Sequence, residues 1–384
     1  MACRLLLSLQ IIATPMKIAQ IAPLYESVPP KFYGGTERVV YYLIEELTKL
    51  GHEVSLFASG DSKTSATLIA DVPEALRLKE ESCEDMLAPH IVQLQNVLER
   101  ANEFDVIHFH NDYLHFPFTY NLKVPHVTTL HGKLTIPELQ LIYNKFGAQP
   151  VVSISDAQRK PVPQANFVAT VYHGLPQNLF NQGNGEGGYF AFLGRISPEK
   201  GCDRAIEVAI ATNTPIKIAA KIDKADQHYF EEKIKPLFGH PLVNYIGEIN
   251  EEQKAGFLGN AKALLFPIDW SEPFGIVLIE AMACATPVIA WNMGSVPEII
   301  EDGVNGFIVS SMDEMINAVD RLSLIERKTA RKIFEARFTA KRMATDYLKV
   351  YDDVIFQQAS QQLANKKTIS INIATDTRNV NVAN

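Results

Sequence analysis

The sequence predicts an α/β protein with two doubly wound domains. The chain has 384 residues, which is long for one domain and comfortable for two. Short apolar segments alternate with helical patterns in both halves, as in parallel sheets covered by helices. A polar, glycine-rich segment, residues 178–188, separates the halves and is expected to link the domains.

The N-terminal domain is expected to span residues 16–177. Thr36 is a good N-cap for a helix whose apolar residues recur every three or four positions, and Gly51 ends that helix. A second helix is expected near residues 88–100. The strands are expected at residues 18–22, 54–58, 106–109, 126–130, 151–154 and 167–171.

The C-terminal domain is expected to span residues 189–340 and to repeat this alternation. Its strands are expected at residues 189–193, 216–220, 243–246, 263–267, 287–290 and 307–309. Gly183, Gly185 and Gly188 match the spacing of a dinucleotide-binding turn, but they precede a strand, whereas the glycines of such a turn follow one. The sequence therefore does not predict a dehydrogenase.

The two ends of the chain are expected to contribute less to the cores. Residues 341–360 have a helical pattern, whereas residues 361–384 are polar without a core-forming period, so a disordered tail is expected there. Residues 1–15 are expected to form a disordered leader, because their apolar run is short and interrupted for a signal peptide. No apolar run approaches the length of a membrane-spanning helix.

The overall composition limits the partners and the compartment. The net charge of -8 argues against nucleic acid as a main partner. The four cysteines are scattered without metal-ligand spacing, which fits a cytoplasmic protein without structural zinc. No strongly basic amphipathic surface is evident, so at most weak peripheral membrane contact is expected. No protein partner can be inferred.

The most informative segment is residues 261–300, which has the pattern of a strand, a short loop, a helix and a second strand. Pro273 suits the first position of the helix, and Gly275 lets a ligand approach the backbone. The first amides of a helix have no partner within it and lie at the positive end of the helix dipole. The amides of Phe274, Gly275 and Ile276 are therefore predicted to bind a phosphate or diphosphate.

Two glutamates flank this predicted phosphate site. Glu272 precedes it, and Glu280 follows eight residues later, roughly 12 Å along a helix axis. That separation is close to the span of a nucleoside diphosphate sugar, so one carboxylate could bind hydroxyls of the sugar and the other those of the ribose. The alternative is that Glu272 caps the helix and Glu280 lies on the surface. Glu280 stands among apolar residues, where a carboxylate is seldom buried without a partner.

The Glu-x7-Glu spacing around EPFG, followed by EAMACATPVIAWNMGSVPEIIEDGVNGFIV, resembles the donor site of retaining glycosyltransferases of family 4. The resemblance extends from about residue 16 to about residue 354. It implies the GT-B architecture, in which two Rossmann-like domains face one another and a C-terminal helix crosses back onto the N-terminal domain. It also implies that Glu272 binds the donor sugar and Glu280 the ribose. The family commonly has glycine where Ala285 stands here and often arginine where Met293 stands.

Two basic residues, Arg195 and Lys200, directly follow the first strand of the C-terminal domain, in GRISPEKG. A diphosphate leaving group gains negative charge as the glycosidic bond breaks, so fixed cations there stabilise the transition state more than the ground state. The family resemblance implies the same Arg and Lys pair. The alternative is that both side chains are surface charges at the start of a helix.

Three residues of the N-terminal domain complete the predicted site. Gly34 and Gly35 follow the first strand, and adjacent glycines allow close approach of the backbone to another group. The resemblance implies that this loop reaches toward the donor phosphates and the acceptor. It also implies that His131, at the end of a strand, contacts the donor sugar, for which an imidazole is a suitable hydrogen-bond partner.

These observations predict a retaining glycosyltransferase that uses a UDP- or GDP-linked sugar. No Asp-x-Asp motif occurs, so no metal and no other cofactor is predicted, and Arg195, Lys200 and the helix amides are expected to neutralise the diphosphate. No second carboxylate is assigned to the far face of the sugar, which favours a front-face mechanism over a double displacement. The predicted catalytic residues are Glu272, Arg195, Lys200 and His131, and the predicted donor-binding residues are Glu280, Phe274, Gly275, Ile276, Gly34 and Gly35.

The acceptor is left open by the sequence and is a polysaccharide, a lipid or a small metabolite. The main alternative is a nucleotide-sugar epimerase or hydrolase on the same architecture, because a fold does not fix the chemistry. A sugar phosphorylase or a sugar-binding protein without catalytic activity would also use such a cleft. The presence of Arg195, Lys200, Glu272 and Glu280 together argues against a protein that only binds sugar.

Overall fold

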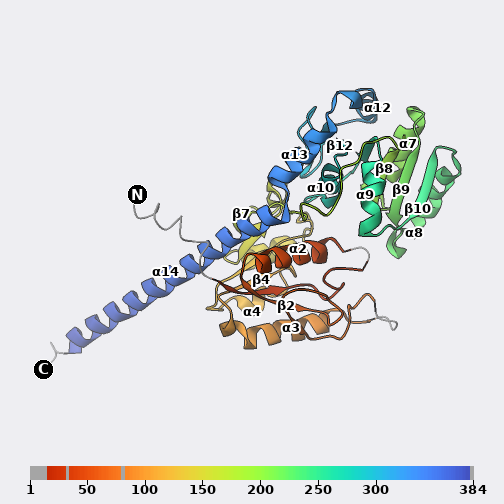
Figure 1. Ribbon diagram of the computed structural model, residues 1–384. Helices are drawn as coiled ribbons and strands as arrows, with labels where there is room; N and C mark the ends of the chain where they lie inside the picture. The colour runs from red at the N-terminus through yellow and green to blue at the C-terminus, as the bar shows by residue number, and fades with distance from the viewer. Residues whose placement is uncertain (1–14, 32–33, 79–82, 381–384) are drawn as a thin grey trace.

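A computed structural model describes residues 15–31, 34–78 and 83–380, with the backbone alone for residues 365–380. Two α/β domains lie against each other, and one long helix starts near their boundary, passes along the N-terminal domain and extends beyond it (Figure 1). Most of the expected leader, residues 1–14, and the last four residues of the expected tail lie outside the described residues.

The N-terminal domain is built on a parallel sheet of seven strands in the order β3-β2-β1-β4-β5-β6-β7. The strands are β1 (Lys17–Ile21), β2 (Glu53–Ala58), β3 (Thr67–Ala70), β4 (Val106–Phe109), β5 (His126–Thr129), β6 (Pro150–Ser153) and β7 (Asn166–Thr170). The helices are α2 (Gly35–Lys49), α3 (Leu87–Glu99), α4 (Phe116–Thr119), α5 (Leu139–Lys145) and α6 (Asp156–Arg159). The strand order reverses between β1 and β4, so ligands are expected beyond the carboxyl ends of these strands.

The C-terminal domain is built on a parallel sheet of six strands in the order β10-β9-β8-β11-β12-β13. The strands are β8 (Phe190–Arg195), β9 (Ile216–Lys221), β10 (Val243–Gly247), β11 (Ala263–Phe266), β12 (Val288–Trp291) and β13 (Gly306–Val309). The helices are α7 (Cys202–Ala211), α8 (Gln227–Tyr229), α9 (Glu251–Gly259), α10 (Ile276–Ala283), α11 (Val296–Ile299), α12 (Met312–Asp320) and α13 (Arg327–Arg337). The strand order reverses between β8 and β11, which brings the loops after these two strands side by side.

The long helix α14 (Ala340–Val380) confirms the predicted crossing onto the N-terminal domain. Tyr347 and Tyr351 on this helix are buried. The Tyr347 hydroxyl bonds to Thr129 of β5 at 2.8 Å, and the Tyr351 hydroxyl accepts a hydrogen bond from Gln20 of β1 at 3.0 Å. A single apolar core then continues from α2 through α14 to α10, so the two domains share packing.

The structure differs from the expected disordered tail, because α14 continues from residue 361 to Val380. The physical reason is that residues 340–380 contain neither glycine nor proline, so nothing in the backbone ends the helix. One further element, β3, was not predicted. It is a four-residue, partly exposed strand at the sheet edge and is too short to show an alternating pattern.

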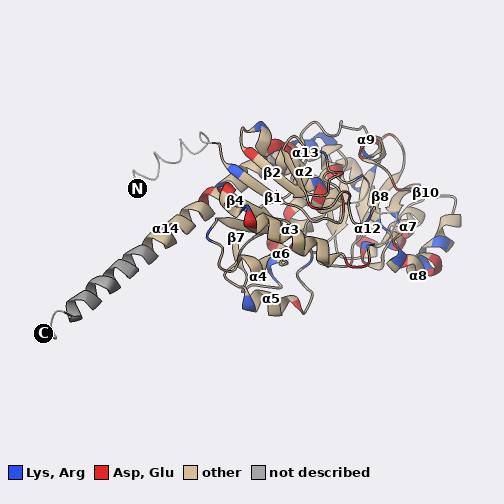
Figure 2. Ribbon diagram, turned by 90° about the horizontal axis from the view of Figure 1, so that it is seen from below, with Lys and Arg blue, Asp and Glu red and all other residues tan. Residues whose placement is uncertain are grey.

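Charged side chains of both signs are mixed, and no large region of the described ribbon carries one sign alone. Figure 2 shows Lys and Arg interspersed with Asp and Glu over both domains. Within the described part of the chain, no helix is both long and apolar enough to cross a membrane.

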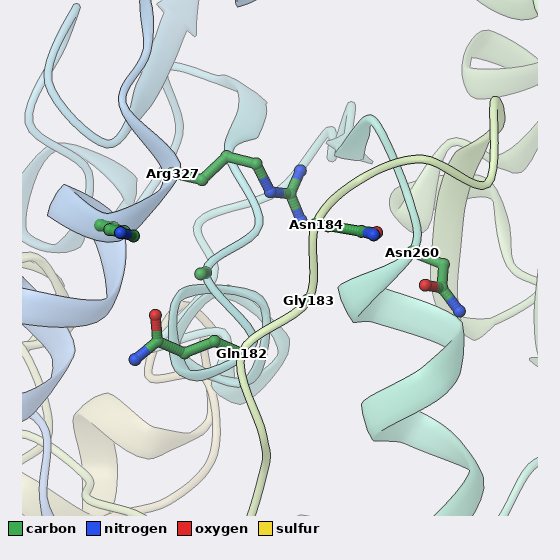
Figure 3. A pocket seen from close by; sticks show the side chains of 7 residues that line it. Gln182, Gly183, Asn184, Asn260 and Arg327 are labelled. Atoms are coloured by element: carbon green, nitrogen blue, oxygen red, sulfur yellow. The ribbon is translucent and has the colours of Figure 1, made fainter.

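The predicted linker is held against the C-terminal domain. The amides of Gly183, Gly185 and Gly187 donate to the carbonyl oxygens of Cys284, Gly259 and Asn260 at 2.9–3.0 Å. A pocket lies beside this segment (Figure 3), lined by Gln182, Gly183, Asn184, Asn260, Ala285, Arg327 and Lys328. None of the predicted site residues lines that pocket.

Alanine at position 285, where the family resemblance implies glycine, adopts an unusual backbone conformation. Ala285 lies just after α10 with a φ of 58°, in the left-handed region that favours glycine. The glycine that the family resemblance implies at this position would adopt this conformation without strain.

Candidate active site

The loop between β11 and α10 forms the centre of the candidate site. The helix begins at Ile276, with Gly275 as its N-cap at φ 80° and ψ 69°. The prediction that Pro273 occupies the first helical position is therefore wrong, because the left-handed Gly275 delays the start of the helix. None of the amides of Phe274, Gly275 and Ile276 donates a hydrogen bond to another of the described residues. These amides remain available to a ligand at the positive end of α10.

The aromatic ring of Phe274 anchors this loop at the domain boundary. Phe274 is buried, and its ring centre lies 4.9 Å from that of His173 and 6.1 Å from that of Tyr172, both in the N-terminal half of the chain. Its carbonyl oxygen accepts a hydrogen bond from Ser295 Oγ at 2.8 Å. The loop is therefore fixed on both sides.

Lys200 and Glu272 are in direct contact. The Lys200 Nζ lies 2.5 Å from Glu272 Oε2 and 4.8 Å from the ring centre of Trp270. Glu272 is 8% exposed, so this ion pair lies largely out of solvent. Gly201 lets the loops after β8 and β11 pack closely, because a Cβ at this position would lie only 2.2 Å from the carbonyl oxygen of Pro267.

The Arg195 guanidinium lies at the end of β8 among carboxylates. It pairs with Glu199 at 2.6 Å, Asp226 at 3.3 Å and Asp223 at 3.6 Å. Sequence reasoning missed the two aspartates, although both follow β9, the neighbouring strand, at the same edge of the sheet. A diphosphate bound by Arg195 would compete with these carboxylates for the guanidinium.

Glu280 is buried and paired. It is 3% exposed, and its Oε1 lies 2.6 Å from Lys254 Nζ on α9. One turn earlier on α9, Glu251 accepts from Arg38 of α2 at 2.7 Å and forms a short hydrogen bond with the Tyr42 hydroxyl. Sequence analysis missed these partners, because nothing local in the chain links α2, α9 and α10. The predicted ribose end of the site therefore lies beside a contact between the domains.

The glycine pair of the N-terminal domain faces the start of α10. A Cβ at Gly35 would lie 3.4 Å from Ile276 Cδ1, which shows how closely this loop approaches the other domain. A Cβ at Gly34 would lie 2.7 Å from Pro30 Cβ and 3.2 Å from Glu37 Oε2. Burial raises the pKa of Glu37 to about 7, so this unpredicted carboxyl group behind the glycines can hold or release a proton near neutral pH.

His131 is part of a buried chain of hydrogen bonds. Its Nε2 lies 2.9 Å from His110 Nδ1, and His110 Nε2 lies 2.8 Å from Gln20 Oε1. Burial lowers the pKa of His131 to about 3 and that of His110 well below its usual value, so both rings are neutral.

The neighbours of His131 fix which of its nitrogens carries the proton. Gln20 Oε1 can only accept, so His110 donates from Nε2 and accepts at Nδ1. His131 then donates from Nε2, and its Nδ1 is left as an acceptor with no partner among the described residues. The arrangement suits His131 to accept a hydrogen bond from a hydroxyl group of a ligand.

The structure thus brings Lys200, Glu272 and the start of α10 together, with Gly35 opposite. Arg195 and Glu280 lie at the same C-terminal edge but contact other side chains. In the part of the chain that the structure describes, no group of three or more His, Cys, Asp or Glu side chains could hold a metal ion.

Gly294 offers a test of how tightly this loop is held. It has a φ of 57°, and a Cβ there would lie 2.4 Å from both the nitrogen and the oxygen of Glu272. We expect Gly294→Ala to displace Glu272 and to lower the rate of donor turnover about tenfold or more, measured as kcat/KM.

The matched control is Gly303→Ala. Gly303 has a φ of 73° with no atom within 4 Å of an added Cβ, so this variant carries the same backbone strain without the clash. Equal activities of the two variants would show that the position of Glu272 does not matter for turnover.

The sequence of this chain is similar to those of known proteins. Residues 178–337 match the model of the family Glycosyl transferases group 1, and residues 33–161 match that of Glycosyltransferase Family 4. The phosphatidyl-myo-inositol mannosyltransferase of Mycolicibacterium smegmatis is 25% identical over 385 residues, covering 88% of this chain and 94% of the relative.

Solved structures share the arrangement of both domains. Sucrose-phosphate synthase from Thermosynechococcus elongatus superposes with a TM-score of 0.73 at 18% identity, covering 89% of this chain and 100% of that chain. The Anabaena protein HepE in complex with UDP-glucose superposes with a TM-score of 0.67 at 19% identity, covering 88% and 100%. These similarities show that the two-domain fold is shared.

Proposed function

This chain belongs to the family 4 glycosyltransferases with the GT-B fold, and from this premise we propose that it transfers a hexose from a nucleoside diphosphate donor with retention of configuration. The observation that carries the proposal is the Lys200–Glu272 pair beside the free amides at the start of α10. A cation, a carboxylate and unpaired N–H groups at one helix terminus suit a sugar diphosphate.

The donor is proposed to lie along α10. The diphosphate would contact Lys200 and the amides of Phe274, Gly275 and Ile276, with Arg195 joining after release from its carboxylates. Glu280 would accept hydrogen bonds from the ribose, and Glu272 and His131 from hydroxyls of the sugar. The likeness to HepE, solved with UDP-glucose, supports a nucleotide sugar, with UDP or GDP as the leaving group.

We propose a front-face reaction within this geometry. The bond between the anomeric carbon and the diphosphate oxygen breaks, and the acceptor oxygen forms its bond on the same face of the sugar. The acceptor proton passes to the departing phosphate oxygen. Lys200 stabilises the negative charge that develops on that oxygen, without need of a metal ion or another cofactor.

The acceptor is proposed to bind against the N-terminal domain, near Gly34 and Gly35. The acceptor classes that we propose are a polysaccharide, a lipid and a small metabolite. The relative named phosphatidyl-myo-inositol mannosyltransferase supports a lipid as one of these classes. An epimerase or hydrolase on this fold is not favoured, because the matched family models are those of transferases. We further propose a cytoplasmic location, which the free, buried Cys202 and Cys284 support.

The first test is a thermal-shift panel of UDP, GDP, ADP and their common hexose conjugates. We expect one nucleotide to stabilise the protein by about 2.7 kcal/mol at a hundred times its Kd, a rise of a few degrees in melting temperature. The same shift is expected with EDTA present, since Lys200 and helix amides neutralise the diphosphate. A shift that requires Mg²⁺ or Mn²⁺ would contradict the proposed mode of binding, and proton NMR of the first product would report the anomeric configuration.

A further inference from the structure

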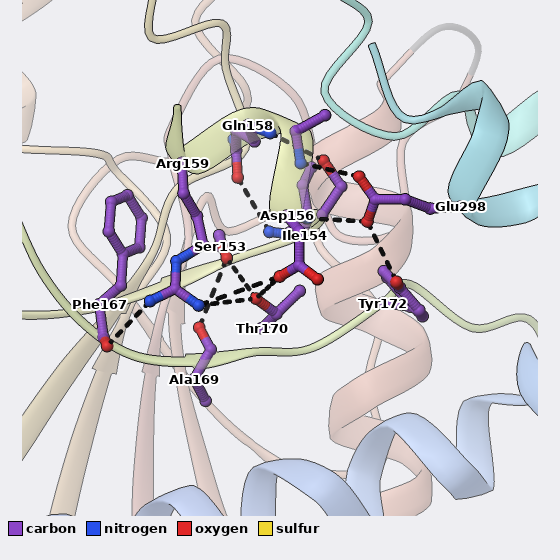
Figure 4. Close-up of polar contacts among 12 residues, drawn as sticks. Ser153, Ile154, Asp156, Gln158, Arg159, Phe167, Ala169, Thr170, Tyr172 and Glu298 are labelled. Carbon is purple, nitrogen blue, oxygen red and sulfur yellow. Dashed lines mark hydrogen bonds and ion pairs between the residues drawn. The ribbon is translucent and has the colours of Figure 1, made fainter. Parts of the chain in front are cut away.

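Glu298, a residue of the C-terminal domain, forms hydrogen bonds with the N-terminal domain (Figure 4). Its Oε2 accepts from the amide of Asp156 at 2.8 Å, and its Oε1 accepts from the amide of Ala157 at 2.7 Å. The hydroxyl of Tyr172 donates to Oε2 at 3.0 Å. Both oxygens of one carboxylate are therefore used across the domain boundary, at the first turn of α6. Hydrogen bonds to a charged acceptor are stronger than those between neutral groups.

The segment that carries Glu298 also holds the donor loop. Ser295 lies three residues before it, and its amide donates to the Glu272 carbonyl oxygen at 3.0 Å. The Ser295 hydroxyl donates to the Phe274 carbonyl oxygen at 2.8 Å. Gly294 packs against the Glu272 backbone so closely that a Cβ would clash. Five residues, 294–298, thus connect the N-terminal domain to the backbone on either side of Pro273.

The C-terminal end of this segment is bonded to its own domain. Arg337 of α13 donates to the Glu298 carbonyl oxygen at 2.6 Å and pairs with the Glu301 carboxylate at 2.8 Å. The backbone of Glu298 is therefore held by its own domain while its side chain reaches the other. A short, hydrogen-bonded path therefore connects α6 with the donor loop.

We propose that Glu298 is a positioning residue for transfer, which sets the distance between the N-terminal domain and the donor loop. The proposal rests on the function proposed for that loop. Glu298 contacts neither proposed substrate, so it acts through α6 on one side and through Ser295 and Glu272 on the other. Losing the carboxylate should leave nucleotide binding on the C-terminal domain in place and make the closed, reactive arrangement less populated.

The test compares Glu298→Ala and Glu298→Gln with the wild type. The probes are UDP with UDP-glucose, or GDP with GDP-mannose if the thermal-shift panel selects guanine. We expect kcat for slow donor hydrolysis to fall at least about tenfold in the alanine variant, because the reacting groups are misplaced, while the nucleotide Kd stays within about twofold. Glutamine has one accepting oxygen instead of two, so its kcat should be intermediate.

Glu301→Gln is the matched control on the C-terminal side. It removes the same charge three residues away, from a side chain that pairs with Arg337 inside one domain. We expect its kcat and its radius of gyration by X-ray scattering to equal those of the wild type. Glu298→Ala should have a larger radius of gyration, because the domains are less firmly tied.

A second pair of variants tests the same contact from the N-terminal side. Asp156→Pro removes the amide that donates to Glu298, at the first position of α6, where proline fits a helix. The preceding residue, Ser155, is already extended at φ -158° and ψ 164°, as a residue before proline must be. Asp156→Ala keeps the amide and removes only the side chain, so its kcat should exceed that of Asp156→Pro.

The outcomes separate this proposal from the proposed function. If the wild type binds none of the nucleotides, the donor assignment is wrong, and the scattering comparison still decides whether Glu298 ties the domains. If the nucleotide binds but Glu298→Ala matches Glu301→Gln in kcat and in scattering, the positioning role is wrong. A parallel loss of nucleotide affinity and melting temperature in Glu298→Ala would indicate a structural role and would also overturn it.

Discussion

Replacing Lys200 with alanine is expected to lower kcat by about 10²- to 10³-fold, the usual effect of removing one group that stabilises developing charge. The Lys200 ammonium lies 2.5 Å from Glu272 and beside the free amides of α10, where the proposed leaving diphosphate gains charge. Because that charge grows during bond breaking, the donor KM should change much less than kcat. Steady-state donor hydrolysis measures both constants, and with an identified acceptor the same split should appear in transfer.

The control for Lys200→Ala is Lys262→Ala. Lys262 directly precedes β11 and is exposed, so it lies at the amino edge of the same sheet, away from the proposed diphosphate. The Lys200 variant also leaves Glu272 without its partner, so its melting temperature must be compared with that of the wild type. A stable, folded Lys200→Ala protein with kcat within threefold of the wild type would remove Lys200 from the mechanism.

The parts of the fold that follow from local pattern were predictable. Buried parallel strands are continuous apolar runs, so segments such as Ala263–Phe266 and Val288–Trp291 are recognisable in the sequence. The edge strand β3 was missed because its four residues are partly exposed and have no such run. The helix α14 extends beyond residue 360, where the polar composition predicts its end, because no glycine or proline interrupts the helix before Val380.

The candidate site was predictable where its residues lie close together in the sequence. Glu272, Gly275 and Glu280 are close in sequence, so one loop and one helix place them. The partners could not be predicted, because Lys254 meets Glu280, and Glu298 meets α6, only through the packing of distant elements. The position of the Arg195 guanidinium was also not predictable, since it depends on which of several nearby carboxylates it contacts.

Replacing Glu280 with alanine is expected to raise the donor KM by about 10- to 100-fold with kcat nearly unchanged, since hydrogen bonds to a charged group contribute about 1.5–3 kcal/mol. A contact to the ribose is made equally in the ground state and in the transition state, so its loss weakens binding without slowing the bond-breaking step. Titration calorimetry with the nucleotide and the nucleotide sugar should therefore show the same loss for both ligands. Glu272→Ala, in contrast, should weaken binding of the nucleotide sugar alone, because the nucleotide lacks the hexose.

The contribution of the Lys254–Glu280 ion pair to stability must be separated from the proposed contribution of Glu280 to donor binding. Glu280→Ala leaves Lys254 nearly buried without its partner, and breaking a buried pair costs about 3–5 kcal/mol of stability. The double variant Glu280→Leu with Lys254→Met removes both charges and the accepting oxygens of Glu280 while keeping similar volumes, so its melting temperature should recover toward that of the wild type. If the donor KM recovers with it, the effect of Glu280 was on stability and the ribose assignment is wrong. If the KM stays high in a stable protein, the carboxylate itself binds the donor, and Lys254 serves to orient that carboxylate within an otherwise apolar helix.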